Sequence, residues 1–216
     1  MSVRKVQFVP EECYHIYNRG NSKQIIYKTP EDHRRFMRLL YVANSDQPFK
    51  IEYIDRSESL ERGEPLVSIG AYCLMPNHFH ILLTPCVEGG VSKLMQKIST
   101  AYSMYFNKRH ERTGALFEGK FKAQHVDSDE YLKYLYAYIH LNPVKLIDPK
   151  WKEGGIKDAA KSYDFAASFA YSSLPDYLGV VRPENAIINN KPFPEYFLSA
   201  GKVHEELFEW LNFTQN

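Results

Sequence analysis

The chain has 216 residues, a length that suits one substantial core with an appendage rather than several equal domains. A content of 44% hydrophobic and 25% charged residues excludes a disordered or fibrous protein. The formal net charge of +1 argues against a polybasic coat for nucleic acid or membranes, so any nucleic-acid surface must be local.

The cysteines and the N-terminus bear on the cellular compartment. Cys13, Cys73 and Cys86 are odd in number and contain no Cys-x-x-Cys spacing, so they provide neither a disulfide framework nor a zinc-finger ligand set. The N-terminal residues lack the apolar stretch of a signal peptide, and no apolar run approaches a membrane span. We therefore expect a cytoplasmic protein without a membrane partner.

The first elements in chain order are a strand, a helix and three further strands. Residues 14–17 predict a strand that ends at turn residues 18–21. Thr29-Pro30 predicts the capped start of an amphipathic helix over residues 30–45. Three β-rich runs separated by turn residues then predict a small antiparallel sheet: 49–54, 66–74 and 79–83.

Helical patterns dominate the rest of the chain. Apolar residues at close to the 3.6-residue period predict a helix over residues 91–108. The aromatic and basic segment after it alternates enough to predict a hairpin around Gly119. A capping box at Asp127, or a shifted version of it, then starts a helix that Pro143 ends. A final amphipathic helix is predicted near residues 202–213.

This order of elements predicts an α+β fold in which helices pack on an antiparallel sheet. We expect one main domain over residues 1–150. Residues 151–216 then form a mainly helical or irregular C-terminal appendage, whose role the sequence does not indicate.

The histidine pair of His78-Phe79-His80 is the first candidate site. Because side chains alternate along a strand, both imidazoles point to one face and can share a metal ion. Chance alone gives about 0.3 such pairs per chain with this histidine content, so the pair by itself is weak evidence. The following residues supply neither the Glu of a cupin nor the Asp and His of a metallo-β-lactamase, which disfavours both zinc classes.

A polar, tyrosine-rich face follows on the helix after residue 129. Tyr134, Tyr138 and Asn142 are spaced at i, i+4 and i+8, so they lie roughly on one face. A phenol, with an ordinary pKa of about 10, can attack phosphorus when a neighbouring divalent metal polarises the phosphate. Asn142 could offer its amide oxygen as a third, hard ligand suited to Mg²⁺ or Mn²⁺. The structural alternative is half-buried tyrosines and an Asn that ends a helix before Pro143.

Four ordered blocks of the chain resemble the REP-associated tyrosine transposases, a group within the single-tyrosine HUH transposases. The blocks are YHIYNRGN at 14–21, YCLMPNHFHILLTP at 72–85, YFNKRHERTGALFEGKFKA at 105–123 and YLYAYIHLNPVKL at 134–146. The resemblance spans roughly residues 8 to 150, so it implies that the domain over residues 1–150 is the catalytic domain. It implies that His78 and His80 hold the metal and that Tyr138 is the nucleophile, with Tyr134 and Tyr136 as alternatives. Asn142 would be the third metal ligand, where related transposases often use Gln.

The resemblance also implies a fold, a reaction and partners. These are a ferredoxin-like fold, Mg²⁺ or Mn²⁺ as cofactor, and cleavage of single-stranded DNA at hairpin-forming or palindromic repeats. The cleavage leaves a 5′-phosphotyrosine and a free 3′-OH and requires no ATP. Family members include both homodimers and monomers, so Tyr138 could act with the histidine pair of either subunit. The rivals are a domesticated DNA-binding protein of the same fold that no longer cleaves, and a hydrolase that uses the histidine metal on another substrate.

Positive charge is concentrated between residues 93 and 122, which hold seven Lys or Arg against two Glu. Aromatic residues are interleaved with these charges, so the segment could contact phosphates and stack on unpaired bases. A solvated helix face above core aromatics is the structural alternative. The candidate DNA contacts are Arg19, Lys108, Arg109, Arg112, Lys120 and Lys122.

Overall fold

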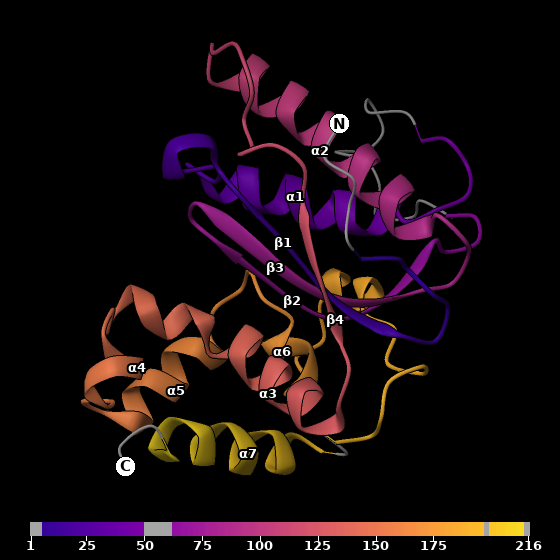
Figure 1. Ribbon diagram of the computed structural model, residues 1–216. Helices are drawn as coiled ribbons and strands as arrows, with labels where there is room; N and C mark the ends of the chain where they lie inside the picture. The colour runs from indigo at the N-terminus through magenta and orange to yellow at the C-terminus, as the bar shows by residue number, and fades with distance from the viewer. Residues whose placement is uncertain (1–5, 50–61, 197–198, 214–216) are drawn as a thin grey trace.

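The computed structural model describes residues 6–49, 62–196 and 199–213. A four-stranded antiparallel sheet in the order β2-β3-β1-β4 lies at the centre of the molecule (Figure 1). Its strands are β1 (Cys13–Arg19), β2 (Val67–Met75), β3 (His78–Pro85) and β4 (Lys122–Val126). A helix connects β1 to β2 and another connects β3 to β4, which together with this strand order is the ferredoxin-like arrangement. The predicted α+β fold is confirmed.

Helices cover both faces of the sheet (Figure 1). α1 (Pro30–Val42) and α2 (Gly90–Arg109) lie side by side on one face. α3 (Asp129–His140) lies on the other face, together with the C-terminal helices. Further helical segments are η1 (Asn21–Lys23), η3 (Asn142–Leu146), α4 (Trp151–Gly154), α5 (Ala159–Ala167), α6 (Leu174–Tyr177), η4 (Pro183–Ile187) and α7 (Ala200–Phe213).

The two faces of strand β3 have different roles. Phe79, Ile81 and Leu83 are fully buried in the core that α1 and α2 cover. Because side chains alternate along a strand, His78 and His80 point to the opposite face, toward α3. This is the orientation that the sequence pattern predicts, and it separates the chemistry-bearing face of the sheet from its apolar face.

Local side chains determine where two of the helices begin. At α1, the Thr29 hydroxyl accepts a hydrogen bond from the Asp32 backbone N–H, and the Asp32 carboxylate accepts one from the Thr29 backbone. At α3, the Ser128 hydroxyl accepts a hydrogen bond from the backbone N–H three residues on. The N-cap of α3 is therefore Ser128, the shifted version of the cap expected at Asp127.

The predicted hairpin around Gly119 is wrong. β4 pairs with β1, and the residues before Gly119 form only an isolated bridge between Gly20 and Phe117. Pairing with β1 satisfies backbone groups along an edge of that strand that would otherwise stay open, which a local hairpin would not do. The strand expected at 49–54 lies outside the described residues except for Phe49, which is in no strand.

The helix that carries Tyr138 is shorter than predicted. α3 ends at His140, and Asn142 opens the 3-10 turn η3 instead of continuing the α-helix. Pro143 explains the change, because it has no N–H to donate and disfavours helical backbone in the residue before it. As a result, the Asn142 side chain is placed by the turn and not by the helical period.

The residues after 150 pack on α3 and along the edge of β2. Backbone hydrogen bonds of 2.9 Å join Tyr171 to Leu74 and Ser173 to Tyr72, so this segment covers an edge of the sheet. A second apolar cluster, which includes buried Trp151, joins α3 and η3 to α5, α6 and α7. Among the described residues, no helix has the length and apolar content that crossing a membrane requires.

Candidate active site

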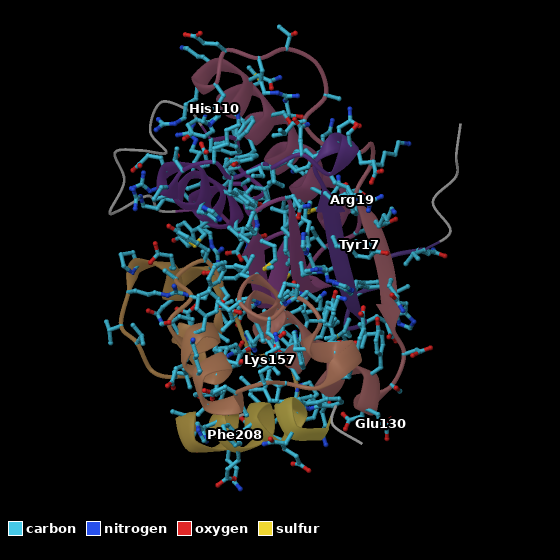
Figure 2. All side chains as sticks on the ribbon, turned by 90° about the vertical axis from the view of Figure 1, so that its left-hand side faces the viewer. Tyr17, Arg19, His110, Glu130, Lys157 and Phe208 are labelled. Atoms are coloured by element: carbon cyan, nitrogen blue, oxygen red, sulfur yellow. The ribbon has the colours of Figure 1, made fainter. Side chains whose placement is uncertain are left out.

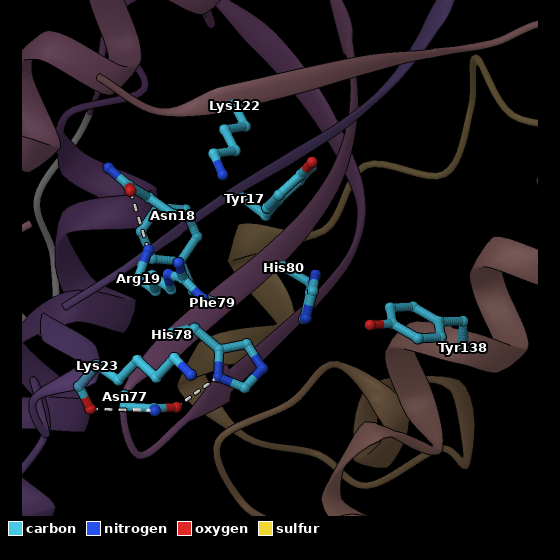
Figure 3. A pocket seen from close by; sticks show the side chains of 10 residues that line it. All are labelled: Tyr17, Asn18, Arg19, Lys23, Asn77, His78, Phe79, His80, Lys122 and Tyr138. Carbon is cyan, nitrogen blue, oxygen red and sulfur yellow. Dashed lines mark hydrogen bonds between the residues drawn. The ribbon is translucent and has the colours of Figure 1, made fainter. Parts of the chain in front are cut away.

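A pocket of about 350 Å³ opens on the α3 side of the sheet, where β1, β3 and β4 come together (Figure 3). Its walls combine the histidine pair, a tyrosine from α3 and two cations from the strands. The residues that matter for its chemistry are Tyr17, Arg19, His78, His80, Lys122 and Tyr138.

Hydrogen bonds orient both imidazoles of the pair. The Asn77 amide nitrogen donates to the Lys23 carbonyl, so the Asn77 oxygen faces His78 and accepts from its Nδ1 at 2.6 Å. The Nδ1 of His80 lies 2.8 Å from the Nε2 of His15. Nε2 of His78 then carries a lone pair, and so does Nε2 of His80 when its Nδ1 is the donor. The two rings have centroids 5.0 Å apart.

Burial keeps this histidine cluster neutral. It lowers the pKa of His15 to about 4, and it lowers that of His78 to about 4 with help from the Lys145 charge. For His80, burial followed by the charge of its neighbours moves the pKa well below its ordinary value. Neutral imidazoles are the form that binds metal ions, so the cluster is in a ligating state at neutral pH.

Asn142 lies close to both His78 and Tyr138. Its side chain is 1% exposed, and neither the amide oxygen nor the amide nitrogen has a hydrogen-bond partner. The Asn142 amide nevertheless raises the pKa of His78 and lowers that of Tyr138, in each case against the effect of burial. A buried amide with both polar atoms unsatisfied is unfavourable in a folded protein, so a ligand at this position would complete its interactions.

Two imidazoles at the pocket and one buried amide beside it have the donor types that a divalent metal ion accepts. Nε2 of His80 is buried without a partner, as is the Asn142 amide oxygen. His80 lines the pocket, and Asn142 lies close to two other residues that line it, His78 and Tyr138. Within the described residues, no group of three His, Cys, Asp or Glu is arranged to hold a metal. Asn142 is the nearby amide that could serve as a third protein ligand, and substrate oxygens would have to complete the coordination of a hard cation.

Tyr138 faces the histidine pair from α3. Its ring centroid is 5.2 Å from that of His80, and Figure 3 shows its hydroxyl directed toward His80. Tyr134 packs against Tyr138 but does not line the pocket. Tyr136 is 2% exposed and packs on the opposite side of the helix against Phe193. Of the three candidate tyrosines, the geometry therefore places only Tyr138 at the histidines.

The candidate DNA-contacting residues are divided among separate surfaces. Arg19 and Lys122 line the pocket, where Arg19 also pairs with Glu118. Lys120 instead lines a second groove, beside α2. The other three lie at or just after the C-terminal end of α2, next to His110 in the sequence, and Figure 2 shows His110 well separated from Tyr17. They are Lys108, Arg109 and Arg112, of which Arg109 lies 3.7 Å from the Asp32 carboxylate.

Sequence reasoning did not identify two residues on β1. His15 and Tyr17 share the face of the histidine pair, because β1 pairs with β3 and Tyr17 lies opposite His80. Alternation along residues 14–17 already places both side chains on one face. The ferredoxin-like fold that the resemblance implies places β1 beside β3, so this pairing was the signal that could have identified both residues.

The chain is similar to known proteins both in sequence and in fold. Residues 63–142, which include the histidine pair, Tyr138 and Asn142, match the family model described as transposase IS200 like. The fold is similar to a structure described as a REP-associated tyrosine transposase bound to a REP hairpin, with a TM-score of 0.52 and 12% sequence identity. That similarity covers 85% of this chain and 90% of the other. No curated protein matches the chain. The predicted resemblance is confirmed.

Proposed function

We propose, from the match of residues 63–142 to IS200-like transposases, that this protein is a transposase that cleaves single-stranded DNA with Tyr138 as its nucleophile. The observation that carries the proposal is the direction of the Tyr138 hydroxyl, toward a pair of neutral imidazoles across a pocket that Arg19 and Lys122 line. A hydrolase acting on another substrate would leave this tyrosine without a role.

The histidine pair and Asn142 would hold the divalent cation, Mg²⁺ or Mn²⁺. His78 and His80 would bind through Nε2, since Asn77 and His15 hold their Nδ1 atoms. When bound, the ion would polarise the scissile phosphate and offset the charge that develops on its oxygens. The nucleophile and the contacts to the substrate come from side chains of the protein.

Tyr138 would attack the scissile phosphorus through its hydroxyl oxygen. Burial raises the pKa of Tyr138 and the Asn142 amide opposes that shift, so the phenol is protonated before the reaction and loses its proton during attack. A phosphotyrosyl bond forms, the bond from phosphorus to the 3′ oxygen breaks, and a free 3′-OH leaves. Since the new bond replaces one phosphodiester with another, a second 3′-OH can attack it and rejoin strands without ATP.

The substrate would be single-stranded DNA at hairpin-forming or palindromic repeats. The similar structure is described as holding a REP hairpin, and the pocket of this chain offers Arg19 and Lys122 to phosphates. Tyr17 offers an aromatic face for an unpaired base at the same pocket. Because Tyr138 faces the histidines of its own chain, we expect cleavage within one subunit, whether or not the protein forms a homodimer.

The test is a covalent protein–DNA adduct. The protein is incubated with Mn²⁺ or Mg²⁺ and single-stranded oligonucleotides that tile the inverted repeats flanking its gene, then denatured and resolved by electrophoresis. We expect an adduct that Tyr138→Phe abolishes and that the matched control Tyr134→Phe retains. An adduct that persists in Tyr138→Phe would refute this nucleophile. Tight binding without any adduct would favour the domesticated DNA-binding protein.

A further inference from the structure

Two lysines lie over the ring of Tyr138. Lys145, from η3, has its Nζ 5.4 Å from the ring centroid. Lys152, from α4, has its Nζ 4.2 Å from the same centroid and 5.5 Å from that of Tyr134. Lys145 lies three residues after Asn142, whereas Lys152 comes from the C-terminal segment, so two separate parts of the chain bring positive charge to one tyrosine.

Neither ammonium group has an acidic partner within the part of the chain that the structure describes. Both side chains are only partly exposed, and the ion pairs and hydrogen bonds found among the described residues include neither of them. Their contacts are with aromatic rings, including that of Trp151 for Lys152. A cation over a ring face is attracted to it, but this attraction is weaker than a buried pairing with an anion.

The two charges also act on each other and on the histidines. Burial, and after it the charge of Lys145, lowers the pKa of Lys152 to about 8. Burial likewise lowers the pKa of Lys145, and both lysines contribute to the low pKa of His80. Positive charge that no acidic side chain among the described residues pairs with is therefore concentrated around Tyr138, and an anion bound there would relieve the repulsion.

We propose that Lys145 and Lys152 form a phosphate-binding site that holds the phosphoryl group carried by the Tyr138 hydroxyl after cleavage. A phosphodiester on Tyr138 has two non-bridging oxygens, so one can face the histidine pair while the other faces the ammonium groups. The flexible stem of a lysine allows its Nζ to move from the ring face to an oxygen bonded to that ring. The C-terminal segment thereby contributes a residue to the active site.

The anion site and the cleavage reaction can be tested separately, although the role of the site in cleavage rests on the proposed function. The intact protein is acetylated at pH 8 with N-hydroxysuccinimidyl acetate, with inorganic phosphate or with chloride at equal ionic strength. Mass spectrometry then gives the acetylation rate of each lysine. The matched control is Lys150, which is exposed and only two residues from Lys152.

Phosphate should slow acetylation of both Lys145 and Lys152, about ten-fold when its concentration is about ten times its Kd, and leave Lys150 unaffected. Lys152→Gln should remove the protection of Lys145. Equal rates in phosphate and chloride would overturn the site. Protection at Lys150 as well would overturn it too, because it would show only non-specific screening.

A second measurement connects the site to DNA cleavage. Lys152→Gln should lower the rate of adduct formation on single-stranded DNA by about ten- to a hundred-fold, because one charge-assisted contact to the phosphate is lost, while Lys150→Gln should not. Unchanged adduct formation in Lys152→Gln would overturn the catalytic role. Phosphate protection in a protein that forms no adduct with any DNA would instead refute the proposed cleavage and retain the anion site.

Discussion

Replacing His15 tests whether a residue on β1 controls the metal affinity of the pocket. His15 lies behind His80, and its Nε2 is 2.8 Å from the His80 Nδ1. When His80 donates its Nδ1–H to His15, the Nε2 of His80 is unprotonated and directs its lone pair into the pocket. His15→Phe keeps an aromatic ring of similar size and removes the acceptor, so it isolates the hydrogen bond from the packing.

The size of the effect follows from the burial of His80. His80 is 6% exposed, so water cannot readily replace the lost acceptor at its Nδ1. The imidazole would be free to adopt the other tautomer, with a proton on the Nε2 that binds metal. Loss of such a supporting hydrogen bond costs about 10- to 100-fold in metal affinity, which is about 1.4 to 2.7 kcal/mol.

The assay is titration of the protein with Mn²⁺ at pH 7.5, followed by electron paramagnetic resonance of the free ion. We expect His15→Phe to weaken binding by the stated factor and His15→Gln, which retains a polar side chain, to weaken it less. The thermal unfolding midpoint of each metal-free variant controls for misfolding. Equal Mn²⁺ affinity in folded His15→Phe and wild-type protein would refute the role of His15.

Three further outcomes are expected. Burial lowers the pKa values of His15 and His78 from 6.5 to about 4, so between these pH values the unfolded chain binds protons that the folded protein does not. The free energy of unfolding should therefore decrease as pH falls through this window, by up to about 1.4 kcal/mol per pH unit for each group, and urea denaturation at pH 7 and pH 5 checks this. Asn142→Leu should preserve or raise the unfolding midpoint of the metal-free protein, because it removes two unsatisfied buried polar atoms. The same substitution should weaken Mn²⁺ binding. A large loss of stability would show that the amide has a structural role. Lys122→Ala should reduce the salt dependence of single-stranded DNA binding by about one unit of slope, whereas an equal reduction in Lys120→Ala would extend the DNA footprint to the groove beside α2.

Local features of the fold could be predicted from the sequence because they depend on residues a few positions apart. The Thr29 cap starts α1, and the 3.6-residue period of α2 appears in the structure as a buried apolar face. Alternation along β3 determines that His78 and His80 share a face, whichever strand pairs with it. The motif blocks around the histidines and Tyr138 were sufficient to indicate the transposase resemblance.

Tertiary structure decided which separate segments meet at the pocket. β4 pairs with β1 because the open edge of β1 offers a full row of backbone partners, a choice that no local pattern in residues 115–126 reveals. His15 reaches His80 only through the pairing of β1 with β3, and Lys152 reaches Tyr138 only because the segment after residue 150 packs on α3. The periodicity of a sequence shows on which side of a helix or strand a residue lies. It does not show which residue of a neighbouring strand or helix that side chain contacts, because such contacts join residues that are distant in sequence. The sequence therefore determined which residue types are available for the chemistry, and tertiary packing determined which of those residues meet at the pocket.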